Sequence, residues 1–329
     1  MKAKKKHVYI SAAVVILAVA ALIYFNPLAK QKKDAAEKPG GDNKIMWMVD
    51  KNGYLYYPLE RENIKFRRDN YSETSSLLIS KVIFESKGAN IYGLLASPKS
   101  AAEQLPGIIL LPGAGVSKES KLELAKNISA LGAVVLVIDQ RGVGETDGGF
   151  PSLDDDYARL LDSKEPYQHL MVYDALKAYD LLYSAPFVDP ERIIIAGESL
   201  GGRVGVIAAA IDRRINGVLL ISSAGFDFKG SGDASKDLFL KSIDSDNYIS
   251  MITPRKIVMM HNAYDMAIPL SSAIRSYLKA QEPKRFVLVN DTACNHGYCS
   301  SMYDGLVESL DFLVDIKSRT ILSVPDKKP

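Results

Sequence analysis

The sequence predicts an α/β protein with a mostly parallel, eight-stranded sheet covered by helices on both faces. Between residues 76 and 320, short continuous apolar runs alternate with amphipathic segments of helical period. Apolar strands of this kind are buried on both faces of a parallel sheet. The composition is that of a globular protein, with 47% hydrophobic and 24% charged residues among 329. About 250 of these residues suit one doubly wound domain.

The first two predicted strands form an antiparallel hairpin. Residues 80–86 and 91–96 are β-branched apolar runs that flank the turn Lys87-Gly88-Ala89-Asn90. Six further strands are expected at 107–111, 133–138, 192–196, 217–221, 256–260 and 285–289. Helices are expected at 119–131, 169–183, 200–211, 269–280 and 301–316.

The N-terminal residues are set apart from this pattern. Residues 8–25 carry no charge and are flanked by lysines, and about 18 apolar residues approach the length needed to span a bilayer. We expect an uncleaved signal anchor, a single-pass location in the cell membrane and a domain outside the cytoplasm. The alternatives are a cleaved signal with secretion, and a buried helix. The predicted organisation is an anchor (1–25), a linker (26–44), an N-terminal extension (45–75), the α/β domain (76–320) and a C-terminal tail (321–329).

Composition disfavours several classes of partner. The formal net charge of +2 is too small to indicate a nucleic-acid partner. Two cysteines and four scattered histidines supply no metal-binding pattern. We therefore expect no metal and no cofactor.

One serine stands in a glycine-framed turn between a predicted strand and a predicted helix. Residues 197–202 read Gly-Glu-Ser-Leu-Gly-Gly. A side chain at Gly197 or Gly201 would collide with the backbone of so sharp a turn, which lifts Ser199 above the sheet edge. The alternative is a tight turn with an incidental serine. The placement favours a nucleophile.

A nucleophilic serine needs a base and an orienting acid. His296 follows the last predicted strand and is the predicted base; His261 is interpreted as a loop-shaping residue and His169 as a polar helix-end residue. Asp265 follows the strand at 256–260 and is the predicted acid. Its rival Asp291 is expected to act as a turn residue.

Two backbone N–H groups are candidates for an oxyanion hole. The N–H of Leu200 directly follows the nucleophile, and that of Ala114 lies in the small-residue loop Pro112-Gly113-Ala114-Gly115. The alternative for this loop is a flexible turn.

Together these residues resemble the α/β-hydrolase superfamily, in the branch of dienelactone hydrolases, feruloyl esterases and prolyl oligopeptidase-like peptidases. Ser199, Asp265 and His296 follow the superfamily's chain order. Residues 139–148, Asp-Gln-Arg-Gly-Val-Gly-Glu-Thr-Asp-Gly, resemble its D-x-R-G-x-G-x-S-x-G loop, and residues 188–192 its D-x-x-R-I segment. The resemblance covers about 80–318 and implies an α/β-hydrolase fold.

Two features differ from the usual pattern of the superfamily, and the state of the two cysteines is left undecided by the sequence. Pro112-Gly113 stands where His-Gly is common. No large lid is evident; a small cap is expected at 225–248, and a second insertion at 150–166 carries an acidic run, Asp154 to Asp156, interpreted as a solvated loop. Cys294 and Cys299 bracket His296 and form either a disulfide or two thiols.

The resemblance implies a serine hydrolase that cleaves a carboxylic ester of a small molecule through an acyl-enzyme. The apolar run at 8–25 predicts that this hydrolase is membrane-tethered. A peptidase acting on short peptides is an alternative, although no charged anchor for a peptide terminus can be identified. Thioester hydrolysis, acyl transfer, and a non-catalytic membrane-tethered binding module are further alternatives.

Overall fold

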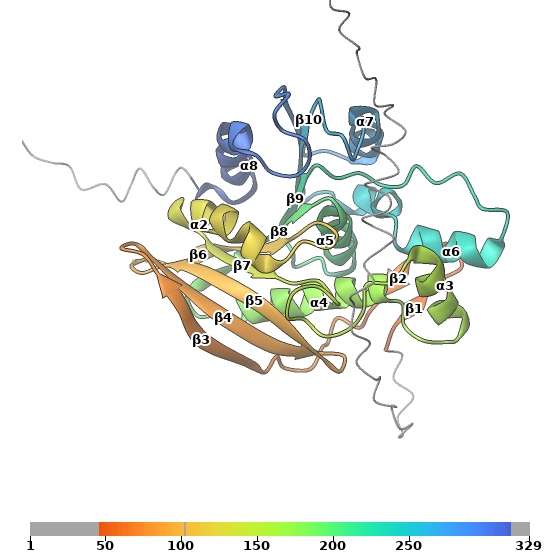
Figure 1. The fold of residues 1–329 in the computed structure, drawn as a ribbon, viewed down its shortest axis with the longest axis horizontal. Coiled ribbons are helices and arrows are strands. Elements are labelled where there is room, and N and C mark those ends of the chain that lie inside the picture. The colour runs from red at the N-terminus through yellow and green to blue at the C-terminus, as the bar shows by residue number, and fades with distance from the viewer. Residues whose placement is uncertain (1–45, 102, 317–329) are drawn as a thin grey trace, which may run out of the picture.

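The computed structural model describes residues 46–101 and 103–316. Within them, nine strands form one sheet in the order β11-β10-β9-β8-β6-β7-β5-β4-β3, and two short strands form another (Figure 1). The large sheet contains β3 (Phe66–Glu73), β4 (Leu77–Ser86), β5 (Ala89–Pro98), β6 (Leu105–Leu111), β7 (Val134–Ile138), β8 (Val188–Glu198), β9 (Gly217–Ile221), β10 (Lys256–Asn262) and β11 (Lys284–Val289). The small sheet pairs β1 (Met48–Val49) with β2 (Leu55–Tyr56). The predicted fold class is confirmed.

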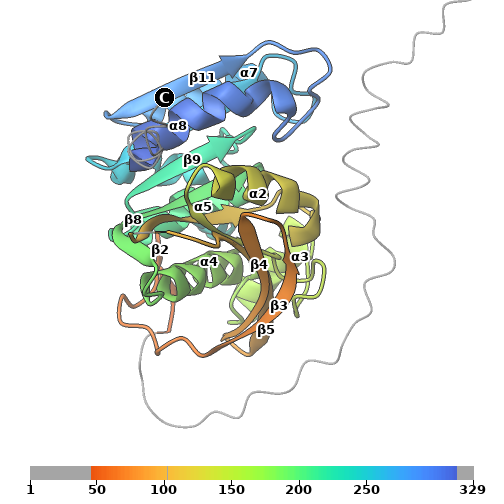
Figure 2. The same ribbon diagram turned by 90° about the vertical axis from the view of Figure 1, so that its left-hand side faces the viewer.

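Six strands of the large sheet are parallel, and three form an antiparallel meander at one edge. The strands β7, β6, β8, β9, β10 and β11 run parallel, whereas β5, β4 and β3 are joined antiparallel. Figure 2 shows β11 at one end of the sheet and the meander at the other. The chain passes from β6 to β7 and then returns to β8 on the other side of β6, which makes a topological switch point between β6 and β8. The loops that follow these two strands therefore meet.

The predicted number of eight strands is wrong by one, because β3 was not recognised. Every residue of β3 is exposed, and its sequence FRRDNYSE is mostly polar. As the edge strand of the meander, β3 buries neither face, and so it shows no apolar alternation. Charged side chains of this kind also protect an edge from pairing with another chain.

Two layers of helices cover the sheet. The helices α4 (Tyr167–Tyr183), α5 (Leu200–Ile211) and α7 (Leu270–Lys279) pack into one apolar cluster, while α2 (Leu122–Ala130) and α8 (Tyr303–Val314) pack into the other. All five were predicted to within a few residues. The ends of α2 and α8 shift because short 3-10 turns, Lys118–Lys121 and Ser300–Met302, precede them.

The N-terminal extension is integrated into the domain. Leu55 and Tyr57 are buried in the main core, and the Leu55 N–H donates to the Tyr248 hydroxyl at 2.7 Å. Arg61 is buried between two carboxylates, those of Asp180 and Asp212. The extension therefore packs against α4 and the end of α5, and it contributes both short strands and β3.

The cap predicted at 225–248 contains the short helix α6 (Ala234–Ser242), which lies beside α3 (Leu153–Leu161) of the second insertion (Figure 1). The rings of Tyr157 and Phe239 are 5.7 Å apart, so the two insertions pack together. The interpretation of the acidic run as a solvated loop is wrong. It lies in α3, and the buried Asp156 accepts the N–H groups of Tyr167 and Gln168, at 2.6 and 2.9 Å. Asp156 thus caps α4.

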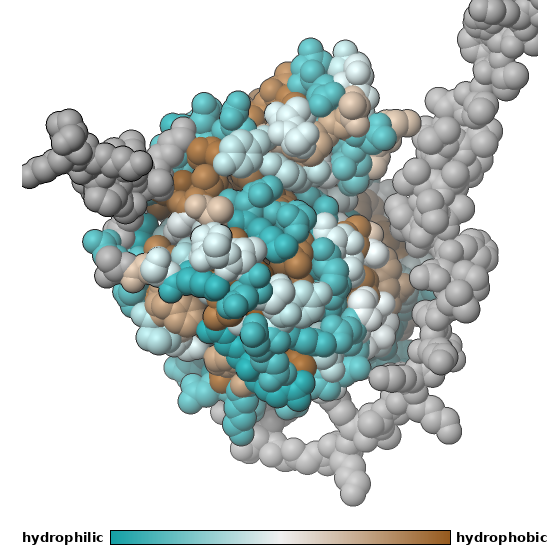
Figure 3. Space-filling view, turned by 60° about the vertical axis from the view of Figure 1, so that its left-hand side comes forward, coloured by the Kyte–Doolittle hydropathy of each residue, from teal (hydrophilic) through white to brown (hydrophobic). Residues whose placement is uncertain are grey.

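Figure 3 shows one face of the molecule, on which hydrophilic and hydrophobic residues are interspersed, as is usual for a protein surface. Within the described residues, no helix combines the length and the apolar character needed to cross a membrane. The predicted anchor, linker and C-terminal tail lie outside the described residues.

Candidate active site

Ser199 occupies a strained turn between β8 and α5. Its φ of +50° and ψ of −116° lie in a region that non-glycine residues rarely adopt. The turn is tight: a Cβ on Gly197 would collide with the backbone of Gly201, and one on Gly201 would collide with the Leu111 carbonyl. The hydroxyl of Ser223 donates to the Ser199 carbonyl at 2.7 Å. This packing holds the serine at the carboxyl end of β8.

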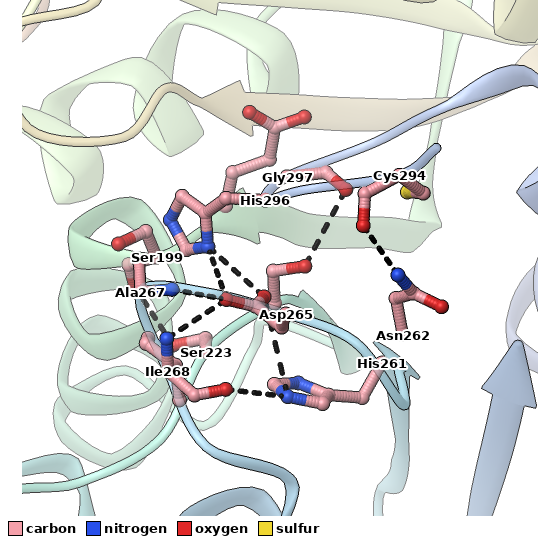
Figure 4. Close-up of polar contacts among 12 residues, drawn as sticks. Ser199, Ser223, His261, Asn262, Asp265, Ala267, Ile268, Cys294, His296 and Gly297 are labelled. Atoms are coloured by element: carbon pink, nitrogen blue, oxygen red, sulfur yellow. Dashed lines mark hydrogen bonds and ion pairs between the residues drawn. The ribbon is translucent and has the colours of Figure 1, made fainter. Parts of the chain in front are cut away.

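His296 and Asp265 come from loops that follow β11 and β10. The Nδ1–H of His296 donates to the two carboxylate oxygens of Asp265, each at 2.9 Å. Figure 4 shows the second ring nitrogen of His296 on the side of Ser199. The structure thus brings together the three residues that the sequence predicted as a triad.

Asp265 is held as a carboxylate. Its side chain is fully buried, and it accepts the N–H groups of Ala267 and Ile268 at 2.9 and 2.8 Å. Burial alone raises the pKa of Asp265, but the hydrogen bonds from His296, Ile268 and Ser222 outweigh it and lower the pKa below its usual value. A charged Asp265 fixes the Nδ1–H tautomer of His296.

The loop that carries His296 is held at several points. A disulfide joins Cys294 to Cys299. The side-chain amide of Asn262 donates to the carbonyls of Asp291, at 2.8 Å, and Cys294. The Met266 N–H donates to the Asn295 carbonyl at 2.8 Å. These bonds fix His296 relative to Asp265, because Asn262 and Met266 belong to the segment that carries the acid.

The loop after β6 lies against the serine. A Cβ on Gly113 would be 3.5 Å from the Ser199 Cβ. The Gln140 amide donates to the Pro112 carbonyl at 2.8 Å and anchors the loop, which is therefore formed although Pro-Gly replaces His-Gly. Among the described residues, no acceptor is paired with the N–H groups of Ala114 and Leu200. Both N–H groups are thus free to bind a ligand near Ser199.

The remaining histidines and Asp291 have other roles. His261 is buried, its Nε2 lies 3.0 Å from the Ile268 carbonyl, and burial lowers its pKa. It shapes the loop of Asp265, as predicted. His169 lies in the first turn of α4, as predicted, where it is fully buried and bonded to Ser242 at 2.6 Å. Asp291 accepts the Ala293 N–H at 2.9 Å as a turn residue.

The glycine-rich segment after β7 is structural. Asp139 is buried against Lys118 at 2.8 Å, and Arg141 is buried against Asp174 at 2.8 Å. The Thr146 hydroxyl accepts the Tyr92 N–H at 3.0 Å. The segment therefore ties β5, β7 and α4 together and presents Gln140 to the loop after β6.

Sequence reasoning missed several residues that support this site. They are Gln140, Glu198, Ser222, Ser223 and Asn262. Each is a common polar residue whose partner lies far along the chain, and only the position of Glu198 beside Ser199 gave a signal. Within residues 46–101 and 103–316, no three His, Cys, Asp or Glu side chains are grouped so that they could hold a metal ion.

The doubly wound sheet, with its turn from strand through serine to helix, defines an α/β-hydrolase. Over residues 60–234, more than half of the chain, the sequence matches the family model described as Acetyl xylan esterase (AXE1), and the chain belongs to this family. The matched segment contains the loop after β6 and Ser199, and it ends before Asp265.

Curated relatives match a shorter part of the chain. The uncharacterized protein YfhR of Escherichia coli (strain K12) is 27% identical over 166 residues, which cover 48% of this chain and 51% of that protein. The polyketide transferase grgF of Penicillium sp. is 26% identical over 200 residues, covering 55% and 64%. The chain thus spans about half the length of the first relative.

Solved structures share the fold. The acetyl xylan esterase from Paenibacillus sp. R4 has a TM-score of 0.64 at 20% identity, covering 77% of this chain and 90% of that one. Est1E from Butyrivibrio proteoclasticus, solved with ferulic acid, has a TM-score of 0.56 at 18% identity, covering 72% and 99%.

Proposed function

We propose that this protein is a serine hydrolase that cleaves carboxylic esters of small molecules through an acyl-enzyme. The observation that carries the proposal is the His296 ring, which is held by Asp265 at 2.9 Å and presents its other nitrogen toward Ser199. A serine in a strained turn, a histidine and a buried carboxylate in this order are the parts that acyl transfer requires.

Each residue has one role in the proposed reaction. His296 removes the Ser199 proton as the hydroxyl attacks the ester carbonyl, and the imidazolium that forms is stabilised by Asp265. The N–H groups of Ala114 and Leu200 bind the oxyanion. His296 then protonates the leaving alcohol. A water molecule, deprotonated by His296, hydrolyses the acyl-enzyme and restores Ser199.

Family membership supports an ester with a short acyl group. The family is named for acetyl xylan esterase, and a structure of the same fold is that of such an enzyme. A thioester is the second candidate, because curated relatives include a thiohydrolase, apmlB of Arthrinium phaeospermum, 29% identical over 174 residues. Both substrates use the same acyl-enzyme.

We also propose that residues 8–25 anchor the protein in the cell membrane with its catalytic domain outside the cytoplasm. The uncharged run flanked by lysines supports an anchor. The disulfide supports an oxidising compartment. Membrane fractionation and protease treatment of intact cells test both parts: a protein found in the membrane and digested from outside agrees, and a shortened soluble protein indicates secretion instead.

Labelling by a fluorophosphonate probe tests the nucleophile without knowledge of the substrate. We expect one adduct per chain, located by mass spectrometry on the peptide containing Ser199. Heat-unfolded protein is the control, because labelling requires the folded triad. A folded protein that fails to label would indicate a non-catalytic binding module. Initial rates on 4-nitrophenyl esters of two to eight carbons, and on an acetyl thioester, then define the acyl group.

A further inference from the structure

Arg203 lies one helical turn after Ser199, and its side chain makes no hydrogen bond or ion pair with the residues that the structure describes. Its guanidinium stacks on the Phe226 ring, with Cζ 4.2 Å from the ring centroid. Its Nη1 is buried and makes no hydrogen bond. The side chain as a whole is only half-buried, and Phe226 is 37% exposed. The guanidinium is therefore sheltered by Phe226, in a residue that is itself partly exposed to solvent.

Other sheltered arginines of the described chain are paired. Arg61 and Arg141 form buried ion pairs, and Arg255 donates to backbone carbonyls. Their partners are Asp180 and Asp212 for Arg61, Asp174 for Arg141, and the carbonyls of Ala209 and Ile215 for Arg255. A sheltered cation without an acceptor destabilises the fold, so the exception at Arg203 beside the nucleophile calls for a ligand.

Within residues 46–101 and 103–316, no carboxylate forms an ion pair with Arg203. Asp244 is the acid whose charge acts on it, but the Oδ1 of Asp244 already accepts the N–H groups of Phe226 and Asp246, each at 3.0 Å. Burial lowers the pKa of Arg203 to about 10, so the guanidinium stays charged at neutral pH.

We propose that Arg203 determines specificity by binding a carboxylate on the ester that Ser199 attacks, an inference that rests on the proposed function. A guanidinium offers a carboxylate two parallel hydrogen bonds, and the N-terminus of α5 favours an anion at the same place. The backbone N–H of Arg203 donates to the Ser199 carbonyl at 3.3 Å, so the two residues lie one turn apart at the start of α5. The carboxylate therefore lies a few bonds from the scissile carbonyl, either on the acyl group or on the alcohol.

Matched ester pairs test this subsite and its orientation. For the acyl side, 4-nitrophenyl hydrogen glutarate is compared with its neutral methyl ester. For the alcohol side, 4-acetoxybenzoate is compared with methyl 4-acetoxybenzoate. We expect Arg203→Met to lower kcat/KM about tenfold or more for the anionic ester of one pair and to leave its neutral partner nearly unchanged. Arg203→Lys should retain part of the preference.

The matched control is Arg285→Met, because Arg285 also stacks on a phenyl ring, that of Phe312, but lies on the edge strand β11. It should leave both pairs unchanged. Equal losses on charged and neutral esters in Arg203→Met would overturn the subsite.

A binding experiment tests the subsite independently of the proposed hydrolytic activity. Calorimetric titration of Ser199→Ala protein with glutarate and with neutral glutaramide requires no turnover. Binding of glutarate that is lost in the Ser199→Ala/Arg203→Met protein supports the subsite even if no ester is hydrolysed. Absence of any difference between the two ligands contradicts it even if Ser199 labels normally.

Discussion

The carboxylate of Glu198 accepts the backbone N–H of Tyr298 at 3.0 Å and so joins the nucleophile turn to the loop of His296. Glu198 directly precedes Ser199, and its side chain is 4% exposed. It also pairs with Lys121, at the end of the short helix that follows the Ala114 loop. The buried side chain of Glu198 therefore links the turn of Ser199, the short helix after the Ala114 loop and the loop of His296.

We expect Glu198→Ala to lower kcat about tenfold to a hundredfold with little change in KM, because small misplacement of catalytic groups is costly. Glu198→Gln keeps an acceptor for the Tyr298 N–H and should recover most of the rate. Lys121→Met is the matched control that removes the ion pair and leaves the Tyr298 bond. If the Gln and Ala variants were equally slow while fully folded, the hydrogen bond would not be the positioning contact.

The disulfide is expected to support turnover as well as stability. Replacing both Cys294 and Cys299 by serine should lower kcat severalfold, because the loop of His296 then depends on its hydrogen bonds alone. Loss of so short a cross-linked loop should cost about 2 kcal/mol of unfolding free energy. The measurement is activity with and without reductant: wild type should slow on reduction and the double variant should not. A wild-type rate that is indifferent to reductant would show that the loop holds its shape unaided.

His169 should make the fold sensitive to acid. Burial, followed by the charge of Lys87, lowers the pKa of His169 to about 3, against about 6.5 in an unfolded chain. Between these values the unfolded state binds the extra proton, so stability falls as the pH drops from about 6.5 toward 3, by up to about 1.4 kcal/mol per pH unit.

Urea unfolding of His169→Gln at several pH values measures this slope. The variant should lose stability more slowly than wild type as pH falls from about 6 to 4. Ser242→Ala is the control, since it removes the hydrogen bond to His169 and leaves the titrating ring in place. Parallel curves for wild type and His169→Gln would contradict the assignment.

Arg61 should be required for a stable domain although it lies outside the predicted core of the fold. Arg61→Met removes the cation between the buried carboxylate of Asp212 and the partly exposed carboxylate of Asp180, and breaking a buried pair costs about 3 kcal/mol or more. Arg67→Met is the control, because its pair with Asp69 is exposed and should contribute little. The measurement is the urea midpoint of unfolding of each variant. Equal midpoints for Arg61→Met and Arg67→Met would mean that the buried ion pair of the extension does not contribute to stability.

The sequence predicted those elements whose burial or backbone geometry is visible in their own residue pattern. Apolar runs predicted β4 to β11, and the turn around Ser199 was readable because the glycines at 197 and 201 are demanded by local backbone crowding. Asp265 and His296 could be chosen because parallel strands bring their carboxyl ends to one edge.

The features that the sequence did not predict depend on contacts between residues that are far apart along the chain. The strand β3 is polar along its length and is recognisable only beside β4. Glu198 gains its role from Tyr298, and Arg203 becomes unusual only when Phe226 covers it and no described residue forms an ion pair with it. Such properties arise from tertiary packing, which periodicity along the chain does not report.

The most direct test of the central claim is kcat/KM for 4-nitrophenyl acetate in wild type, Ser199→Ala, His296→Ala and the double variant. The proposed triad acts as a unit, so each single variant should lose at least about 10³-fold, and the double variant should lose little more. A folded Ser199→Ala protein that retains a tenth or more of wild-type kcat/KM would contradict the assignment of Ser199 as the nucleophile.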